Sequence, residues 1–407
     1  MTETTNQIQP DRIAIIDALR GFALAGIVIC HVVENYIGAQ PPGPFNEVVH
    51  QGLADDIVDG FIGIFLRGKF IALFSFLFGL SFFIQMDNAN QKGSYFGGRF
   101  LWRLLLLLVI GFVHSLFYRG DILTVYAVLG IFLIPFYKVP NKWVLGISAI
   151  LFFGAARFLI FYLTGGDALF SEMDINPDNP KILNYYDTLK NGSLWEVFAT
   201  NATEGHIDKA EFQYGLFGRG YFTFAFFLVG LFVGRSGFFK RIHEEKKLTK
   251  NILIYASITL VLSLIAMSAA FMSMGQNFNM KSWNAMLGFT AMDISNAAMT
   301  LIYIALFVII YRKTKGQKWL NKFVPYGKTA LTNYVAQSIV FTFMLFGWGL
   351  GLIGELRQLY TFLLALVFIA LQMWLSKIWL RYFYYGPLEW LWRSLTFFKI
   401  MPLKRKD

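Results

Sequence analysis

Cysteine is almost absent from this sequence. Cys30 is the only one among 407 residues, so no disulfide can form within one chain and the fold does not depend on the redox compartment. No two of the five histidines lie three or four residues apart, which excludes the usual spacing of metal ligands on a helix. Gly327-Lys328 lacks the preceding glycine of a phosphate loop. We therefore expect no metal site and no phosphate loop.

Charged residues are also scarce. They make up 15% of the chain, against roughly 25% in an average soluble domain, whereas hydrophobic residues make up 56% and aromatic residues 18%. A soluble fold could not cover so much apolar surface. The net charge of +11 is divided into short basic clusters between apolar runs, the pattern of cytoplasmic loops rather than of a nucleic-acid surface. The composition predicts an all-α polytopic bundle surrounded by membrane lipids, with no nucleic-acid partner.

The apolar runs define the expected helices. A membrane span needs about 20 mainly apolar residues. The first run has no small-residue cleavage site after it, so we interpret it as a retained helix rather than a signal peptide. The sequence predicts one transmembrane domain over residues 1–407 with about ten spans, at residues 13–33, 67–86, 101–118, 122–137, 143–163, 215–234, 252–273, 284–311, 329–353 and 359–380.

The distribution of Lys and Arg predicts the orientation. Residues 34–66 contain no Lys or Arg, and residues 164–214 contain three Lys against nine acidic residues. The alternate loops are rich in Lys and Arg, which favours the cytoplasmic side. We therefore expect two long extracytoplasmic loops at 34–66 and 164–214 and both termini in the cytoplasm. Residues 386–397, with two Trp, predict a short interfacial helix on the cytoplasmic face.

The first span contains two ionisable residues. Arg20 and His31 are eleven residues apart, so they share one helix face and lie about 16 Å apart along its axis. Ionisable groups inside a membrane are costly and usually functional. This face would present a cation near the cytoplasm and an imidazole toward the outside. The alternative is that Arg20 reaches the inner headgroups and His31 is a buried polar contact.

A second ionisable pair lies between the third and fourth spans. His114 is near the end of one span and Asp121 precedes the next, after a tight turn at Arg119-Gly120. Together they could supply a general base and a carboxylate that orients it. Each also has a structural alternative: an aspartate before a helix is an ordinary N-cap, and an imidazole at a helix C-terminus is stabilised by the helix dipole.

Further polar residues lie in or beside other spans. Lys69 and Arg219, at the expected outer ends of two spans, could bind an anionic acceptor or contact lipid headgroups. Asp293 lies within a span, next to the amide of Asn296. Helical spacing places four polar residues on one face of the 329–353 run, where they line a cavity or, as we favour, bond a neighbouring helix: Thr329, Thr332, Asn333 and Gln337.

Five segments resemble the YeiB-like family of bacterial membrane proteins. They span nearly the whole chain in the expected order: DALRGFALAGI (17–27), GKFIALFSFLFGLSF (68–82), GFVHSLFYRGDIL–YA (111–127), YGKTALTNYVAQS (326–338) and RYFYYGPLEWLWRSLTF (381–397).

This family resembles, more distantly, the transmembrane acyltransferases, among them bacterial sugar O-acyltransferases and heparan-glucosaminide N-acetyltransferase. The bacterial O-acyltransferases carry Arg and His with ten residues between them in their first helix, the spacing of Arg20 and His31. YeiB-like proteins more often have Asn at the position of His31, so the match of His114 and Asp121 to the family's own motif is the safer one.

The resemblance implies a bacterial inner-membrane enzyme that uses cytoplasmic acyl-coenzyme A as its donor and no metal. Candidate residues can be assigned to each role. The catalytic candidates are His31, His114 and Asp121, the donor's phosphates would contact Arg20, Arg99 or Arg103, and the acceptor, a sugar or other envelope molecule, would contact Lys69, Arg219, Asp293 and Asn333.

Two other functions agree with the same residues. Intramembrane charges can relay protons in a transporter or flippase, although the sequence has no paired half-repeats and no matching broken helices of the kind such proteins use. A non-catalytic envelope scaffold is the third possibility. Association into a homodimer also stays open.

Overall fold

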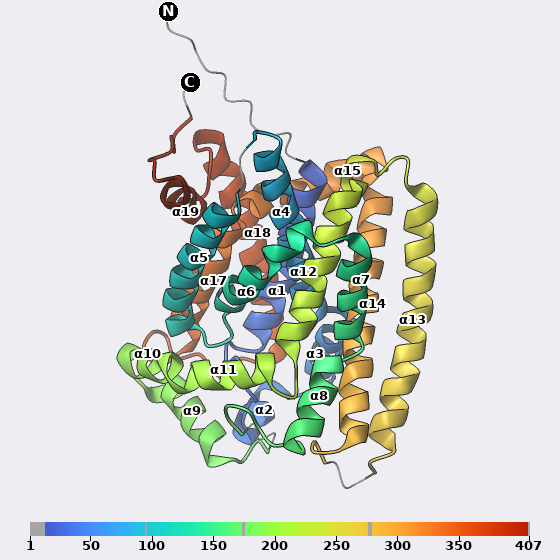
Figure 1. The fold of residues 1–407 in the computed structure, drawn as a ribbon. Helices are drawn as coiled ribbons and strands as arrows, with labels where there is room; N and C mark the ends of the chain where they lie inside the picture. Colours follow the sequence, from blue (N-terminus) through green and yellow to red (C-terminus); the bar gives the residue numbers. More distant parts are fainter. Residues whose placement is uncertain (1–12, 94–95, 173–175, 276–278, 406–407) are drawn as a thin grey trace, which may run out of the picture.

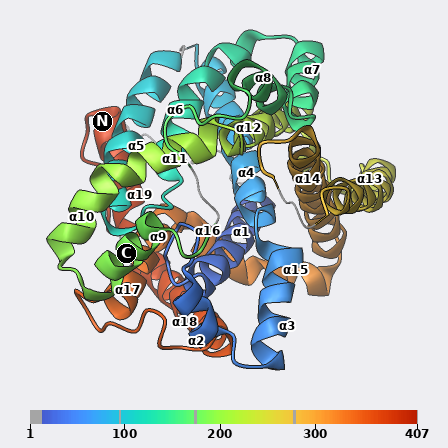
Figure 2. The same cartoon turned by 90° about the horizontal axis from the view of Figure 1, so that it is seen from below.

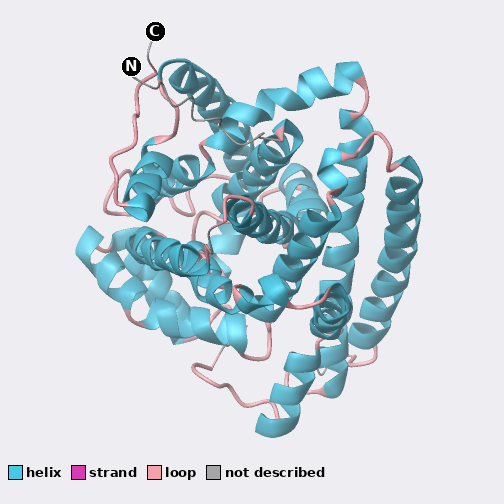
Figure 3. Cartoon of the chain, turned by 45° about the horizontal axis from the view of Figure 1, so that its top comes forward, coloured by secondary structure: helices cyan, strands magenta, loops and turns pink. Residues whose placement is uncertain are grey.

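Helices form nearly all the regular structure in the computed structural model, which describes residues 13–93, 96–172, 176–275 and 279–405. Figure 3 shows this helical content, with loops joining the helices. The sole strand-like pairing among the described residues is one isolated antiparallel bridge between Phe383 and Lys404. The predicted all-α class is confirmed.

The helices follow one another closely along the chain. In order they are α1 (Ala14–Val33), α2 (Gly43–Val49), α3 (Leu53–Phe61), the π-helix η1 (Ile62–Leu66), α4 (Lys69–Asn90), α5 (Gly97–Phe117), α6 (Leu123–Leu133), the 3₁₀-helix η2 (Pro135–Lys138), α7 (Asn141–Phe152), α8 (Ala155–Thr164), α9 (Pro180–Asn191), α10 (Leu194–Ala202), α11 (Glu204–Tyr214), α12 (Arg219–Ser236), η3 (Phe238–Lys240), α13 (Lys246–Met272), α14 (Trp283–Tyr311), α15 (Thr314–Leu320), η4 (Asn321–Phe323), α16 (Val324–Lys328), α17 (Ala330–Leu345), α18 (Gln358–Tyr382) and α19 (Pro387–Phe397).

Each predicted span coincides with an apolar helix or pair of helices. Six are long and apolar enough to cross a membrane: α1, α3 continued by α4, α5, α13, α14 and α18. The pairs α7–α8 and α11–α12, bent by 51° and 60°, would raise the number to eight, and α6 and α17 are shorter apolar helices. The count of ten crossings therefore stays a prediction.

The two long segments predicted as loops are largely helical. Residues 34–66 form α2, α3 and η1, and residues 164–214 contain α9, α10 and α11. Local capping explains part of this difference, because Asn179 caps α9 and Ser193 forms a capping box with Glu196 at the start of α10. Helices α2 and α9–α11 gather at one end of the bundle, while α15 and α19 lie at the other (Figure 1).

Helix α1 is the centre of the bundle. It packs against α4, α14, α16, α17 and α18, and Figure 2 shows it surrounded by other helices. Helix α13 lies at the edge of the bundle and packs mainly on α14 (Figures 1 and 2). Ile254, Val261, Leu262 and Ile265 are between 45% and 61% exposed. An apolar surface of this kind indicates contact with lipid.

Two glycines hold α4 and α12 together. A Cβ on Gly79 would lie 2.0 Å from the carbonyl oxygen of Phe227, and a Cβ on Gly230 would lie 2.1 Å from that of Phe76. Only glycine permits such contact between two helix backbones, as in other membrane helix pairs. This packing fixes the start of α12 beside the start of α4.

Residues 387–397 form the helix α19, where the sequence predicts an interfacial helix, and α19 binds two other helices. The indole Nε1 of Trp392 donates to the Arg103 carbonyl of α5 at 2.9 Å. The Glu389 carboxylate accepts the backbone N–H groups of Leu331 and Thr332 at 2.6 and 3.1 Å, and the Thr332 hydroxyl at 2.6 Å. Because Leu331 and Thr332 lie in the first turn of α17, Glu389 acts as an N-cap supplied by another helix.

Glu389 is expected to make the attachment of α19 sensitive to pH. Desolvation raises the pKa of this half-buried carboxyl. A raised folded-state pKa gives stability that is present at low pH and lost as the pH rises through that pKa. We expect Glu389→Gln to flatten this decline in thermal unfolding curves from about pH 4 to pH 8.

The matched variant Glu389→Ala should cost about 1–2 kcal/mol at every pH, because the N–H groups of Leu331 and Thr332 lose their acceptor. Identical unfolding curves for all three proteins would contradict the capping role.

Candidate active site

The turn between α5 and α6 brings His114 and Asp121 together. His114 Nδ1 lies 2.7 Å from Asp121 Oδ1, and the two residues are 1% and 2% exposed. The predicted pairing of an imidazole with a carboxylate is therefore present in the structure.

Asp121 also has the structural role that the sequence allowed. Its Oδ2 accepts the backbone N–H of Thr124 at 2.9 Å and the Thr124 hydroxyl at 2.8 Å, and its Oδ1 accepts the N–H of Leu123 at 3.0 Å. Lys209 of α11 places its Nζ 3.9 Å from Oδ2. One carboxylate thus caps α6 and orients His114.

Sequence reasoning missed the other partner of His114. The Nε2 atom lies 2.8 Å from the hydroxyl of Ser338 on α17, and Ser338 is completely buried. A serine in an apolar helix usually bonds the carbonyl four residues earlier, and Ser338 also lies 3.3 Å from the Tyr334 carbonyl. Nothing in the local sequence distinguishes it from such a serine.

His31 faces the same group of residues. Its ring centroid is 4.9 Å from Tyr118, 5.5 Å from Tyr36 and 6.2 Å from Tyr334, and Tyr334 is 4.8 Å from His114. Its Nδ1 is buried and has no hydrogen-bond partner in the described part of the chain. We call His31, His114, Asp121 and Ser338 the histidine cluster. It contains all three catalytic candidates from the sequence.

Arg20 lies toward the other end of α1. Its guanidinium donates to Asp17 at 2.7 Å and to the Ser81 hydroxyl of α4 at 3.0 Å. Buried apolar residues of α1, including Leu24 and Val28, separate it from His31. Arg20 is therefore bonded within the bundle, and a passage from it to the histidine cluster stays a prediction.

Arg99 and Arg103, the other donor candidates, lie against α19. The guanidinium carbon of Arg103 is 3.7 Å from the centroid of the Trp392 ring, and that of Arg99 is 5.3 Å from Phe397. These contacts are cation–π interactions.

A second arginine–histidine pair with the same spacing lies on α5. Arg103 precedes His114 on α5 by eleven residues, as Arg20 precedes His31 on α1. The two histidines meet in one cluster, since both rings pack against Tyr334. Of the two pairs with this spacing, only the one on α1 was predicted from the sequence.

A second buried group of charges surrounds Asp293 of α14. Arg219 donates to Asp293 Oδ1 and Arg157 to Oδ2, each at 2.5 Å. Arg157 also donates to the carbonyls of Leu216 and Phe217, at 2.8 and 2.6 Å, in the break between α11 and α12. Sequence reasoning missed Arg157, although a lone arginine within an apolar run is itself a signal.

Lys69 lies beside this group and Asn333 does not. A Cβ on Gly68 would be 3.0 Å from Arg219 Nη2 and 3.1 Å from Asn296 Nδ2, while the neighbouring Lys69 donates to the Gly63 carbonyl at 2.7 Å. We call Lys69, Arg157, Arg219, Asp293 and Asn296 the Asp293 cluster.

The polar face of α17 mostly bonds its neighbours. Asn333 donates to the Ser376 hydroxyl of α18 at 2.9 Å, Thr329 does so at 3.1 Å, and Thr332 bonds Glu389. Gln337 is fully buried, and neither polar atom of its side chain has a partner among the described residues. For Asn333, these contacts support the helix-bonding alternative.

Asp293→Ala is expected to destabilise the protein by about 3–5 kcal/mol, because it leaves two buried guanidinium groups without their counter-ion. Unfolding of the purified protein in detergent measures this cost. Replacing Arg157 by Met in the Asp293→Ala background removes one of the stranded charges and should recover part of the loss. An unchanged unfolding midpoint in Asp293→Ala would contradict the ion-pair network.

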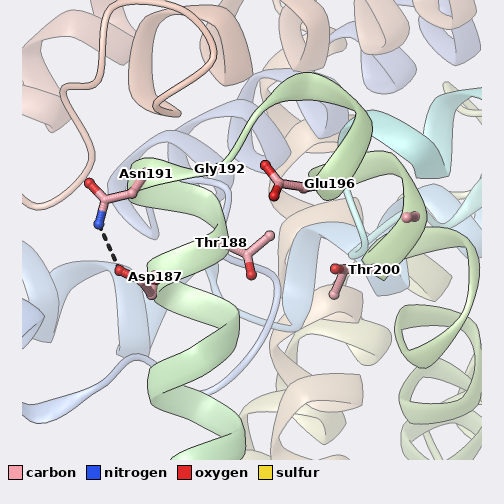
Figure 4. Close-up of a pocket in the computed structure, with 7 residues that line it drawn as sticks. Asp187, Thr188, Asn191, Gly192, Glu196 and Thr200 are labelled. Carbon is pink, nitrogen blue, oxygen red and sulfur yellow. Dashed lines mark hydrogen bonds between the residues drawn. The ribbon is translucent and has the colours of Figure 1, made fainter.

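A polar hollow of about 350 Å³ opens between α9 and α10 (Figure 4). Its lining includes Asp187, Asn191, Glu196 and Thr200. Asn201, the next residue on α10, donates to the Leu116 carbonyl of α5 at 2.9 Å. The hollow therefore lies at the end of α5 that carries His114.

Comparison with known proteins confirms the resemblance that the motifs predict. Residues 233–399 match the family described as protein of unknown function DUF418, and residues 12–189 match the family described as heparan-alpha-glucosaminide N-acetyltransferase, catalytic. The chain is 29% identical to YxaH of Bacillus subtilis and 27% identical to a 39.9 kDa protein encoded beside an amylase in Bacillus acidopullulyticus, over 97% of each chain. It is 25% identical to YeiB of Escherichia coli, over 95% of this chain and 96% of that one.

Proposed function

From the similarity of residues 12–189 to the family described as heparan-alpha-glucosaminide N-acetyltransferase, catalytic, we propose that the chain is an acyltransferase of the bacterial inner membrane. It moves an acyl group from cytoplasmic acyl-coenzyme A to an acceptor on the outer side. The observation that carries the proposal is the histidine cluster, in which a buried imidazole is oriented by a carboxylate. Three of its members, His31, His114 and Asp121, lie within residues 12–189, the stretch similar to an acetyltransferase catalytic region.

The chemistry requires a base for the acceptor hydroxyl or amine. Asp121 accepts a hydrogen bond from the Nδ1–H group of His114, which leaves the Nε2 lone pair available to take a proton from the acceptor. His31 offers a second nitrogen, because its Nδ1 has no partner among the described residues. A positioned base of this kind accelerates acyl transfer by about 10²–10⁴-fold.

The donor's phosphates would rest on Arg20, Arg99 and Arg103. Guanidinium groups suit phosphate oxygens because they offer paired N–H donors. Arg103 stacks on Trp392 of α19. The donor would therefore have to bind Arg103 beside the Trp392 ring or displace α19 from it. The pantetheine arm would then run along α1 toward His31.

The acceptor would approach from the end of the bundle that carries α9–α11. The hollow beside Asp187 offers carboxylate, amide and hydroxyl groups to a sugar, and Lys69 and Arg219 of the Asp293 cluster would hold an anionic group of the acceptor. Asp293 would orient Arg219 there. Asn333, bonded to α18, is the weakest of the predicted acceptor contacts.

Binding of coenzyme A to the purified protein tests the proposal. A ligand at 100 times its Kd stabilises the folded state by about 2.7 kcal/mol, so coenzyme A should raise the unfolding temperature. Pantetheine, which lacks the nucleotide phosphates, serves as the matched control and should raise it less. Proteoliposomes given radiolabelled acetyl-coenzyme A should then transfer label to an envelope extract. No stabilisation and no transfer would overturn the proposal.

Transport is the second candidate, and the broken helices favour it. The sequence predicted none, but α7–α8 and α11–α12 are both bent, and Arg157 of α8 and Arg219 of α12 meet at Asp293. Transporters place their substrate sites at such breaks. If the protein is a transporter, wild-type protein should move a solute into proteoliposomes without binding coenzyme A. The Arg219→Gln variant should then lose this solute flux.

A further inference from the structure

Ser338, His114 and Asp121 have the connectivity of a nucleophile, a base and an orienting acid. We infer that Ser338 carries the acyl group as a covalent ester between donor and acceptor, so that transfer proceeds in two steps. This inference rests on the proposed acyltransferase function and adds a residue and an intermediate to it. The distances are 2.7 Å from Asp121 Oδ1 to His114 Nδ1 and 2.8 Å from His114 Nε2 to Ser338 Oγ.

The hydrogen-bond directions support this assignment. Asp121 accepts from Leu123, Thr124 and His114, and an ionised carboxylate can only accept. Nδ1 therefore donates to Asp121, and in a neutral imidazole Nε2 is then the acceptor. The Ser338 hydroxyl has two acceptors within reach, His114 Nε2 at 2.8 Å and the Tyr334 carbonyl at 3.3 Å. The shorter contact is the stronger one, so the hydroxyl proton points at the base.

In the first step, the Ser338 Oγ attacks the carbonyl carbon of the donor thioester. Its proton passes to His114 Nε2, and the carbon–sulfur bond breaks. The sulfur takes the proton from Nε2 and leaves as the free thiol of coenzyme A. The products are an ester on Ser338 and neutral His114, as in other serine-dependent acyl transfers.

In the second step, the acceptor hydroxyl or amine attacks the carbonyl carbon of the ester. Its proton passes to His114 Nε2 and then to the Ser338 Oγ as the ester bond breaks. His31 is a positioning residue in this step, because its buried and unpartnered Nδ1 can accept a hydrogen bond from the incoming acceptor. Two histidines in one cluster thus have different tasks.

The test uses full-length protein in proteoliposomes with radiolabelled acetyl-coenzyme A and no acceptor. We expect wild-type protein to release one equivalent of coenzyme A in a burst and to retain label that peptide mass mapping places on Ser338. An oxygen ester resists neutral hydroxylamine, whereas an acyl-imidazole does not, so this treatment separates Ser338 from either histidine as the carrier. Label that mapping places on a histidine, or that neutral hydroxylamine removes, would overturn the inference.

Two serine variants provide the comparison. Ser338→Ala should lower the label and the burst by about 10²–10⁴-fold. Ser115→Ala is the matched control, because Ser115 is equally buried and bonds a different histidine, His206, at 3.2 Å; it should keep the label.

The outcomes separate the two proposals. If wild-type protein transfers acetyl groups but retains no label, and Ser338→Ala transfers at the wild-type rate, the covalent step is wrong and the acyltransferase function stands. If wild-type protein neither binds coenzyme A nor releases it from the thioester, the proposed function itself fails. Loss of label in Ser338→Ala with unchanged thermal stability supports the inference, since a merely structural serine would not form the ester.

Discussion

Replacing His114 with Ala is expected to lower acyl transfer by about 10²–10⁴-fold. His114 alone in the histidine cluster contacts both a carboxylate and a hydroxyl, at 2.7 and 2.8 Å. Its removal takes away the base and leaves Asp121 and Ser338 without their shared partner. Initial rates in proteoliposomes with acetyl-coenzyme A and an envelope extract measure the effect on kcat.

The control for His114 is a histidine that lies outside the cluster's bonding chain. His206 of α11 bonds Ser115, and His206→Ala should retain most of the activity. Coenzyme A binding should survive in His114→Ala, because the proposed phosphate contacts lie at the far end of α5. Full activity in His114→Ala would remove the proposed base.

Asp121→Asn is expected to lower the transfer rate by about 10²–10⁴-fold, by reversing the His114 tautomer. Oδ2 accepts two donors from Thr124 and lies 3.9 Å from the Lys209 Nζ, whereas the one fixed donor to Oδ1 besides His114 is the Leu123 N–H. The amide oxygen should therefore stay on the Oδ2 side, and the amide N–H₂ should face His114 at the cost of the Leu123 hydrogen bond. His114 Nδ1 would then have to accept, which puts its proton on Nε2. An imidazole in that state cannot receive a proton from a nucleophile.

Stability separates this effect from damage to the fold. Because Asn is as good an N-cap as Asp, Asp121→Asn should unfold within about 1 kcal/mol of wild-type protein. Asp121→Ala removes cap and orienting group together and should lose both stability and activity. An active Asp121→Asn variant would mean that the carboxylate serves α6 alone.

Local pattern was enough to predict the pairs that lie close in the sequence. Periodicity placed Arg20 and His31 on one face of a helix, and a tight turn placed Asp121 near His114, seven residues away. The contact of Ser338 with His114 could not be predicted from local pattern, because the two residues lie 224 positions apart along the chain. Only the packing of α17 beside α5 and α1 brings them together.

The helix breaks escaped prediction for a different reason. An apolar run has the same mean hydropathy whether its helix is straight or bent, because hydropathy is averaged over many residues. Gly154, at the break between α7 and α8, has a φ of +74°, a conformation that glycine adopts without strain. Arg157 then reaches the carbonyls freed at the second break. A lone arginine and a nearby glycine were the available signals.

The hold of α19 on α17 affects how the protein should be handled in the laboratory. The last described residues are held by backbone hydrogen bonds, in which the Arg405 N–H donates to the Tyr382 carbonyl and the Tyr384 N–H donates to the Leu403 carbonyl. Glu389 accepts hydrogen bonds from the first turn of α17, the helix that carries Ser338. Removal of the residues after Phe397 would break these backbone bonds and should loosen the attachment of α19. The carboxyl-terminal helix should therefore be kept intact when the protein is prepared, because Glu389 caps the helix that carries Ser338.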